Sequence, residues 1–379
     1  MNVAQKRLSL ETLWLGTVAT ILLLVSVSQA QSSQTLSAHS SSPQSATTVL
    51  SSLPEADTII YASPQRILND AAPKVISATE LAKLRASFVD IKKNVGIDPG
   101  SIDVVAVAIR FHKPAADLSF VPPDLLAVVS GDFSADSMLT LAGVFLQDNA
   151  RTEKYGSRTL TIMKIDPIAE AAQKNPLLKS FVEMGAVALN SNTLAVGNIS
   201  YVRAAVDASE GTGRISSEVL NSLLRDPNAL VSAAGSPLTA FAKSFGIMGT
   251  QNTKRESCPT HFGDFYAAIT MDGTNFNLRG AMNTDNPDTA KIINGLLASV
   301  LQPAIDSIPD KDAQAVLRGI KMTPKENEIV WEADVPEQVV ATMLREQTQA
   351  KPSPQTEAKP TETSTKKPIT KPKRRTRRK

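Results

Sequence analysis

Cys258 and His261, in the run Cys-Pro-Thr-His, have the spacing of one half of a structural zinc site. Such a zinc ion needs four ligands, and the rest of the chain offers no second cysteine and only two further histidines, His39 and His112. The sequence therefore predicts no metal ion, and we find no motif for another cofactor. Two basic residues shortly before Cys258 favour its thiolate form, so a reactive thiol is an alternative to an ordinary loop cysteine.

Motifs of hydrolases and nucleotide-binding proteins are absent: the chain has no G-x-S-x-G, no H-E-x-x-H and no Walker sequence. Four serines stand where helices are expected to begin, and helix capping explains them (Ser63, Ser134, Ser200 and Ser236). Three aspartates flank expected strands and could pair as acid and base, although strand ends often carry such turn residues (Asp98, Asp103 and Asp132). The sequence thus predicts a protein without catalytic activity.

The last nine residues have the most direct physical consequence, because seven of them are Lys or Arg. A cluster of positive charges of this density binds polyanions and releases their counterions. The predicted contact residues are Lys371, Lys373, Arg374, Arg375, Arg377, Arg378 and Lys379. In an exported protein we expect anionic lipid headgroups, lipopolysaccharide or acidic wall polymers as partners, and no nucleic acid. A solubilising tail without a specific partner is the alternative.

The first thirty residues have the pattern of a secretory signal peptide. Lys6 and Arg7 precede an apolar run of 15 residues, Leu13 to Val27, and Ser28-Gln29-Ala30 offers a small-x-small cleavage site. The apolar run is shorter than the ~20 residues that a spanning helix needs. No cysteine is nearby for lipid attachment. We therefore expect a periplasmic or secreted protein without a transmembrane helix after cleavage; a retained anchor is the alternative.

Composition divides the remainder of the chain. Residues 31–52 are rich in Ser, Gln and Thr, and residues 348–379 in Pro, Thr, Lys and Arg, so both are expected to be disordered. Between them lies a body long enough to bury a sizeable core. The whole chain carries +3, the segment from Lys351 onward +9 and the first thirty residues +1, which leaves −7 on the body. An acidic body thus carries a strongly basic tail.

The elements that must position these residues follow from hydrophobic periodicity and capping signals. In residues 53–213 we predict strands at 58–62, 102–111 and 124–130, hairpins at 151–165 and 186–197, and helices after Ser63-Pro64, Ser134 and Ser200. The clearest helix begins at the capping box Ser77-Ala78-Thr79-Glu80 and ends before Gly96. Its apolar stripe is Leu81, Leu84, Phe88, Ile91 and Val95.

A similar series follows in residues 225–347. It consists of a strand at 228–234, a second Ser-Pro helix start at 236–237, a hairpin around 272–273, a helix from 286 to 301, strands at 319–322 and 328–333, and a last helix from 336 to 344. The recurrence predicts two similar halves, 53–213 and 225–347, by internal duplication. Capping signals repeat in every α+β protein, which is the alternative explanation. The predicted class is α+β with mostly antiparallel sheets of hairpin-helix units.

Two runs, LPEADTIIYASPQRIL and GIDPGSIDVVAVAIRF, show this pattern most fully. With the capped units at Ser63-Pro64, Ser236-Pro237 and Asn286-Pro287, the chain resembles uncharacterised exported bacterial proteins built from repeated strand-strand-helix units. The resemblance covers about residues 53–347 and implies an envelope location and an α+β fold. It carries no binding residue across.

The sequence therefore favours an exported, non-catalytic envelope protein that acts in interaction or scaffolding and binds polyanions through its tail. A periplasmic carrier of an apolar, lipid-like ligand is the alternative, suggested by many small and aliphatic residues and an aromatic content of 4%. An enzyme of unrecognised type is the third possibility.

Overall fold

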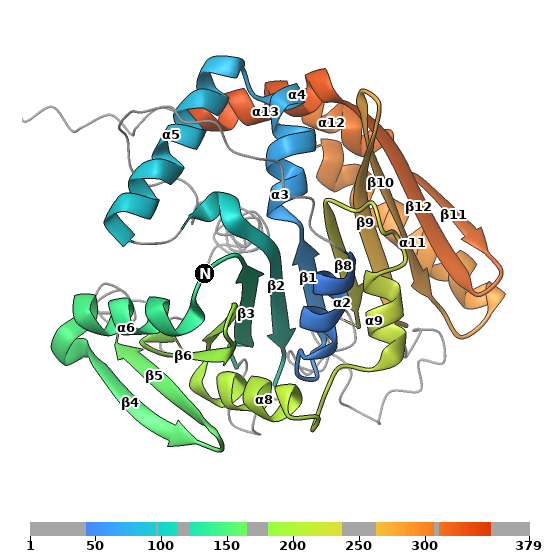
Figure 1. Ribbon diagram of the computed structural model, residues 1–379. Helices are drawn as coiled ribbons and strands as arrows, with labels where there is room; N and C mark the ends of the chain where they lie inside the picture. Colours follow the sequence, from blue (N-terminus) through green and yellow to red (C-terminus); the bar gives the residue numbers. More distant parts are fainter. Residues whose placement is uncertain are drawn as a thin grey trace, which may run out of the picture.

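The computed structural model describes residues 43–95, 98–112, 121–164, 181–236, 263–306 and 311–349. Twelve strands in these ranges form a single sheet in the order β11-β12-β10-β9-β8-β1-β2-β3-β7-β6-β5-β4 (Figure 1). Neighbouring strands pair antiparallel throughout this sheet. The predicted α+β class with antiparallel pairing is confirmed.

The first half contributes seven strands in the described ranges. They are β1 (Thr58–Ala62), β2 (Ile102–Arg110), β3 (Asp124–Gly131), β4 (Ala150–Tyr155), β5 (Arg158–Lys164), β6 (Glu183–Asn190) and β7 (Thr193–Gly197). The principal helices are α2 (Pro43–Ser51), α5 (Ala78–Val95), α6 (Ala135–Leu146), α8 (Ile199–Ser209) and α9 (Ser217–Leu223), with short helical pieces α3 (Pro64–Arg66) and α4 (Ala72–Val75) and turns between them.

The second half contributes five strands and three helices in the described ranges. The strands are β8 (Val231–Gly235), β9 (Phe265–Asp272), β10 (Asn275–Asn283), β11 (Lys321–Lys325) and β12 (Glu328–Pro336). The helices are α11 (Pro287–Asp306), α12 (Lys311–Arg318) and α13 (Glu337–Gln349).

Strands β1 and β8 pair at the middle of the sheet, with Ile60 opposite Ala233. Outward from this pair the order is β1-β2-β3-β7-β6 on one side and β8-β9-β10-β12-β11 on the other. Along the chain, a helix follows the third strand of each series (α6 after β3, α11 after β10) and another follows the fourth (α8 after β7, α13 after β12). The β4–β5 hairpin extends the first series alone. The two series are therefore related by an approximate two-fold rotation about the β1–β8 pair, which Figure 1 shows as α6 and α11 at opposite sides.

The largest hydrophobic cluster lies on one face of the sheet, which we call the α8 face. On β2, Val104, Ala106 and Ala108 are buried, and each intervening side chain is only half-buried. Helices α2, α8 and α9 cover the buried positions with residues such as Leu50, Tyr201, Val202, Val206 and Leu223. Because successive strand residues point to opposite faces, this alternation identifies which face carries the main core.

Helix α2 corrects one prediction from the sequence. Residues 31–52 were expected to form a disordered linker, yet Pro43–Ser51 is helical and its apolar side chains join the main cluster. The buried positions Ala46, Val49, Leu50 and Leu53 have three- and four-residue spacing. A Ser/Thr-rich composition masked this stripe, because burial depends on a few well-spaced side chains rather than on the average polarity of the segment.

The capping predictions are right at α5 and α6, right in part at α3 and wrong at α8. Ser77 and Glu80 form the expected reciprocal box, with Glu80 N–H donating to Ser77 Oγ (3.2 Å) and Ser77 N–H donating to Glu80 Oε2 (3.1 Å). Ser63 occupies the N-cap position of α3 and Pro64 its first turn, as predicted, but the Ser63 side chain makes no capping bond. Helix α8 begins one residue before Ser200, with Asn198 at its N-cap position. The expected C-cap Gly96 lies outside the described residues.

The opposite face, which we call the α6–α11 face, is covered at its two ends. Helix α6 packs there on β6 and β7, where Ala135, Ala188 and Leu194 are buried. Helix α11 packs on β10 and β12, where Met282, Ala290, Ile293 and Ile329 are buried. These two clusters occupy corresponding places in the two strand series. On this face, the five central strands β3, β2, β1, β8 and β9 lie between the two clusters.

Candidate functional site

Most residues singled out from the sequence lie outside the described residues. The predicted polyanion contacts Lys371, Lys373, Arg374, Arg375, Arg377, Arg378 and Lys379 are among them, and so are His39, Cys258 and His261. The structure therefore tests neither the tail nor the half zinc site. In the ranges that it describes, no three Cys, His, Asp or Glu side chains gather as metal ligands would.

Two of the three flagged aspartates line one hollow of about 250 Å³ between the end of α5 and the start of α6. Asp98 accepts a hydrogen bond from Gly100 N–H (2.9 Å) and pairs with Lys92 (3.0 Å). Asp132 lies across the hollow beside Ser134, whose Oγ accepts the Ser137 N–H (3.2 Å). Asp98 thus stabilises a turn and Ser134 caps a helix, as their positions in the sequence indicate.

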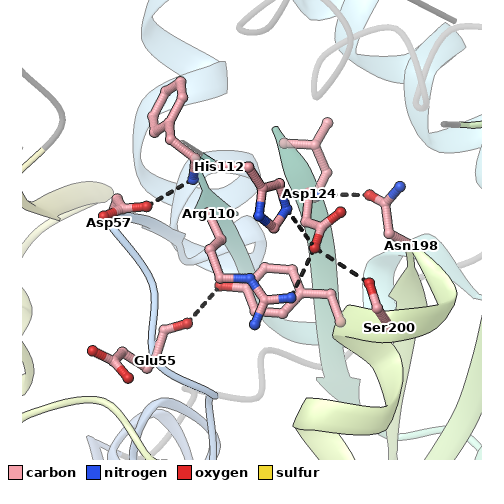
Figure 2. Close-up of polar contacts among 10 residues, drawn as sticks. Glu55, Asp57, Arg110, His112, Asp124, Asn198 and Ser200 are labelled. Carbon is pink, nitrogen blue, oxygen red and sulfur yellow. Dashed lines mark hydrogen bonds and ion pairs between the residues drawn. The ribbon is translucent and has the colours of Figure 1, made fainter. Parts of the chain in front are cut away.

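A polar cluster that the sequence did not reveal surrounds Asp124, where β2 ends and β3 begins (Figure 2). Three donors converge on one oxygen, Asp124 Oδ2: Arg110 Nη2 at 2.7 Å, His112 Nε2 at 2.9 Å and Ser200 Oγ at 3.3 Å. The Asp124 side chain is 13% exposed, against 32% for Arg110 and 38% for His112. The carboxylate is thus largely shielded, and its positive partners reach solvent.

The same cluster fastens α8 to the sheet. Asn198 Oδ1 accepts the Leu125 N–H (2.7 Å), and Asn198 N–H donates to the Leu125 carbonyl (3.0 Å). The Arg110 guanidinium stacks on the Tyr201 ring with 4.4 Å to its centroid. Burial raises the pKa of Tyr201, whose hydroxyl donates to the Glu55 carbonyl (3.0 Å). These contacts connect β2, β3, α8 and the segment before β1.

Asp124, His112 and Ser200 are the residue types of a hydrolase triad, but their arrangement does not fit one. In a triad the imidazole lies between the hydroxyl and the carboxylate, so that it can take the hydroxyl proton. Here the carboxylate lies in the middle, and both Ser200 and His112 donate to it. Asp124 is also paired with Arg110. The arrangement orients α8 and neutralises a shielded carboxylate, which is a structural role.

The central part of the α6–α11 face has a different character. Its side chains, which we call the aliphatic strip, come from β3, β2, β1, β8 and β9. They are Leu125, Ala127, Val129, Val105, Val107, Ile109, Ile60, Val231, Ala233, Ala267 and Ile269. None of them is fully buried, and Ile269 is 36% exposed. None belongs to the three hydrophobic clusters formed by the described residues.

Cross-strand register makes the strip continuous. Ala127 lies opposite Val107, Val107 opposite Ile60, and Ile60 opposite Ala233. Ala233 then lies opposite Ala267, so that one apolar row crosses five strands. At about 4.8 Å between strands, this row is about 19 Å long. All eleven side chains are aliphatic, so the strip offers dispersion contacts and no side-chain hydrogen bonds of its own.

The sequence carried a signal for the strip but little for the polar cluster. Runs such as 104–109 and 125–129 are apolar at every position, which indicates apolar side chains on both faces of a strand. The Asp124 cluster joins residues separated by up to 90 positions. The only hint was an Arg and a His at the end of one strand and an Asp at the start of the next.

No helix in the described ranges combines the length and the apolar character needed to cross a membrane.

No protein family and no curated protein matches the chain. Three solved structures of TP0453 are similar to it. Crystal form III has 12% identity and a TM-score of 0.42, and covers 78% of this chain and 97% of that chain. Crystal form IV has 11% identity and a TM-score of 0.40, and covers 78% of this chain and 95% of that chain. Crystal form I has 12% identity and a TM-score of 0.40, and covers 79% of this chain and 96% of that chain.

Proposed function

We propose that this chain is a non-catalytic carrier that binds an aliphatic, lipid-like ligand on the aliphatic strip. The observation that carries the proposal is the contrast between the two faces of the central strands. On the α8 face, Val104, Ala106, Ala108, Leu126 and Val128 are completely buried under helices. On the other face, equally apolar neighbours are only half-buried. A contiguous apolar surface that stays partly accessible to solvent is a candidate interaction site.

An aliphatic chain suits the strip better than a polar ligand does. The strip presents only Ala, Val, Leu and Ile side chains, so a polar ligand would lose its hydrogen bonds to water without replacing them. Burying a Val or Ile side chain under a ligand contributes about 1.5–3 kcal/mol when burial is complete. Micromolar binding corresponds to about −8 kcal/mol, so many partial contacts along the strip must add up to exceed this value and the cost of association together.

Export and the basic tail complete the proposal. The signal-like first thirty residues support a carrier in the periplasm or outside the cell, and the seven Lys/Arg among the last nine residues support a loose attachment to anionic envelope surfaces. This joins the interaction role expected from the sequence to the carrier role. In the Asp124 cluster, His112 and Ser200 both donate to the carboxylate, unlike the residues of a hydrolase triad. This arrangement supports a role without catalysis.

Binding is tested with the purified full chain after removal of co-purified lipid. Native mass spectrometry of the untreated protein should show a lipid adduct, and 1-decanol should bind the stripped protein in calorimetry. The triple variant Val105→Thr, Val107→Thr, Val129→Thr keeps side-chain shape and strand propensity but makes the strip polar. We expect it to lower decanol affinity at least tenfold, because three apolar contacts are weakened.

Matched controls carry the same kind of change away from the strip. Val144 on α6 and Ile292 on α11 are 65% and 57% exposed, and Val144→Thr with Ile292→Thr should leave decanol affinity unchanged. If the unchanged protein neither carries a lipid adduct nor binds decanol, the carrier proposal is wrong. If the triple variant and the control variant lost decanol affinity equally, decanol would bind elsewhere than on the strip.

A further inference from the structure

One polar side chain interrupts the α6–α11 face beside the strip. Thr58 begins β1 and, two residues before Ile60, points to the same side of the sheet. Its neighbours in register are Ile109 on β2 and Gly235 on β8. Thr58 is 7% exposed, and its hydroxyl is shielded from solvent without a hydrogen-bond partner in the described part of the chain.

A shielded hydroxyl without a partner is costly. Leaving such a donor and acceptor unsatisfied destabilises a protein by about 1–3 kcal/mol, and native structures contain few of them. Valine has nearly the same shape as threonine and would fill this place without that cost. A hydroxyl at this position is therefore better explained by a partner that is bound during function than by packing.

We infer that Thr58 is the polar contact of the ligand, and that the ligand is an aliphatic chain ending in an uncharged oxygen group, an alcohol or an ester. This inference rests on the proposed carrier function and specifies its ligand. The chain lies along the strip from Ile60 across Ala233 and Ala267, and its oxygen end exchanges a hydrogen bond with Thr58 Oγ1. A hydroxyl can donate to an ester carbonyl and can both donate to and accept from an alcohol.

The charge of the surroundings selects the uncharged form. No strip residue is basic, and the nearest guanidinium of the polar cluster, Arg110, points to the other face because it is separated from Ile109 by one position. A carboxylate at Thr58 would therefore be desolvated without a counter-ion. Because the hydroxyl is shielded, the ligand reaches it only when neighbouring side chains part, which lowers the apparent affinity by the fraction of open molecules.

The test compares 1-decanol, decane and decanoate on the full chain with and without Thr58→Val. We expect the variant to bind decanol about tenfold more weakly and decane unchanged, since it loses one hydrogen bond and no apolar contact. In the unchanged protein, decanoate at pH 8 should bind more weakly than decanol. The variant should also be at least as stable to urea as the unchanged protein, because an unsatisfied hydroxyl has been removed.

Thr323→Val is the matched control, because Thr323 is exposed on the edge strand β11 and points to the opposite face. It should leave all three affinities unchanged. If Thr58→Val binds decanol as tightly as the unchanged protein, Thr58 is not the polar contact, although the carrier function stands. If decanol and decane both fail to bind the unchanged protein, the carrier function itself is wrong and this inference falls with it.

Discussion

Replacing Gly280 by Ala should destabilise the protein through one identifiable contact. Gly280 on β10 lies opposite Trp331 on β12, and the indole packs across the glycine. A Cβ at position 280 would stand 2.3, 2.4 and 2.5 Å from three atoms of the indole ring. Carbon atoms in contact are about 3.5–4.0 Å apart, so the ring would have to move by more than 1 Å.

The expected change in the free energy of unfolding is the balance of two effects. Overpacking of this kind costs about 1–3 kcal/mol. Glycine in a strand is itself about 0.5–1 kcal/mol less favourable than alanine, so part of the cost is offset. We expect Gly280→Ala to lower the free energy of unfolding by about 1–2 kcal/mol, which corresponds to a few degrees in Tm.

The approximate two-fold relation supplies the compensating change. Gly280 and Trp331 correspond to Ala127 and Val196, which are opposite each other on β3 and β7 in the other strand series. The double variant Gly280→Ala, Trp331→Val therefore rebuilds a pair that the protein already contains. In the Trp331→Val background, Gly280→Ala should be neutral or stabilising by up to about 1 kcal/mol, although Trp331→Val alone costs about 2–3 kcal/mol.

Urea unfolding followed by far-UV circular dichroism measures all four proteins of this double-mutant cycle. Gly295→Ala is the control, because Gly295 lies within α11 with no atom near its missing Cβ, and the same change there should stabilise by about 0.5–1 kcal/mol. If Gly280→Ala costs the same free energy in both backgrounds, contact with the indole is not the cause and the reasoning is refuted.

Three further predictions follow from the ion pairs and the tail. Asp124→Asn should lower the free energy of unfolding by about 1–3 kcal/mol in urea melts, because Arg110 then keeps a charge without its carboxylate. The hydrogen bond from Arg151 holds the pKa of Glu183 below its usual range, so this pair stabilises at neutral pH and loses its effect as the pH falls through the lowered pKa. Arg151→Met should thus be destabilising at pH 7, with a difference that shrinks in acid, once Glu183 is protonated, and in high salt. A chain ending at Gln347 should no longer co-sediment with anionic vesicles, whereas the full chain should do so and be released by salt; equal, salt-independent pelleting would contradict a role for the tail.

Local signals were sufficient where a structure depends on neighbours in the chain. The capping box at Ser77 predicted the start of α5, and the turn glycines at 156 and 273 predicted two hairpins that the structure contains. Both glycines have positive φ (54° and 58°), a conformation that glycine adopts without strain. Composition gave the wrong prediction for α2, because the burial of this segment depends on four spaced apolar residues and not on the serines and threonines around them.

By itself, the sequence determined the α+β class, most strands and helices, and the apolar character of the central strands, because each follows from periodicity and backbone preference within a few residues. Only the tertiary structure decided that the two series share one sheet across β1 and β8, which face of it the helices cover, and where Arg110, His112, Asp124 and Ser200 meet. These outcomes depend on strand register and on contacts between distant segments. A single sequence does not contain that information in local form, since any apolar strand can pair with several others.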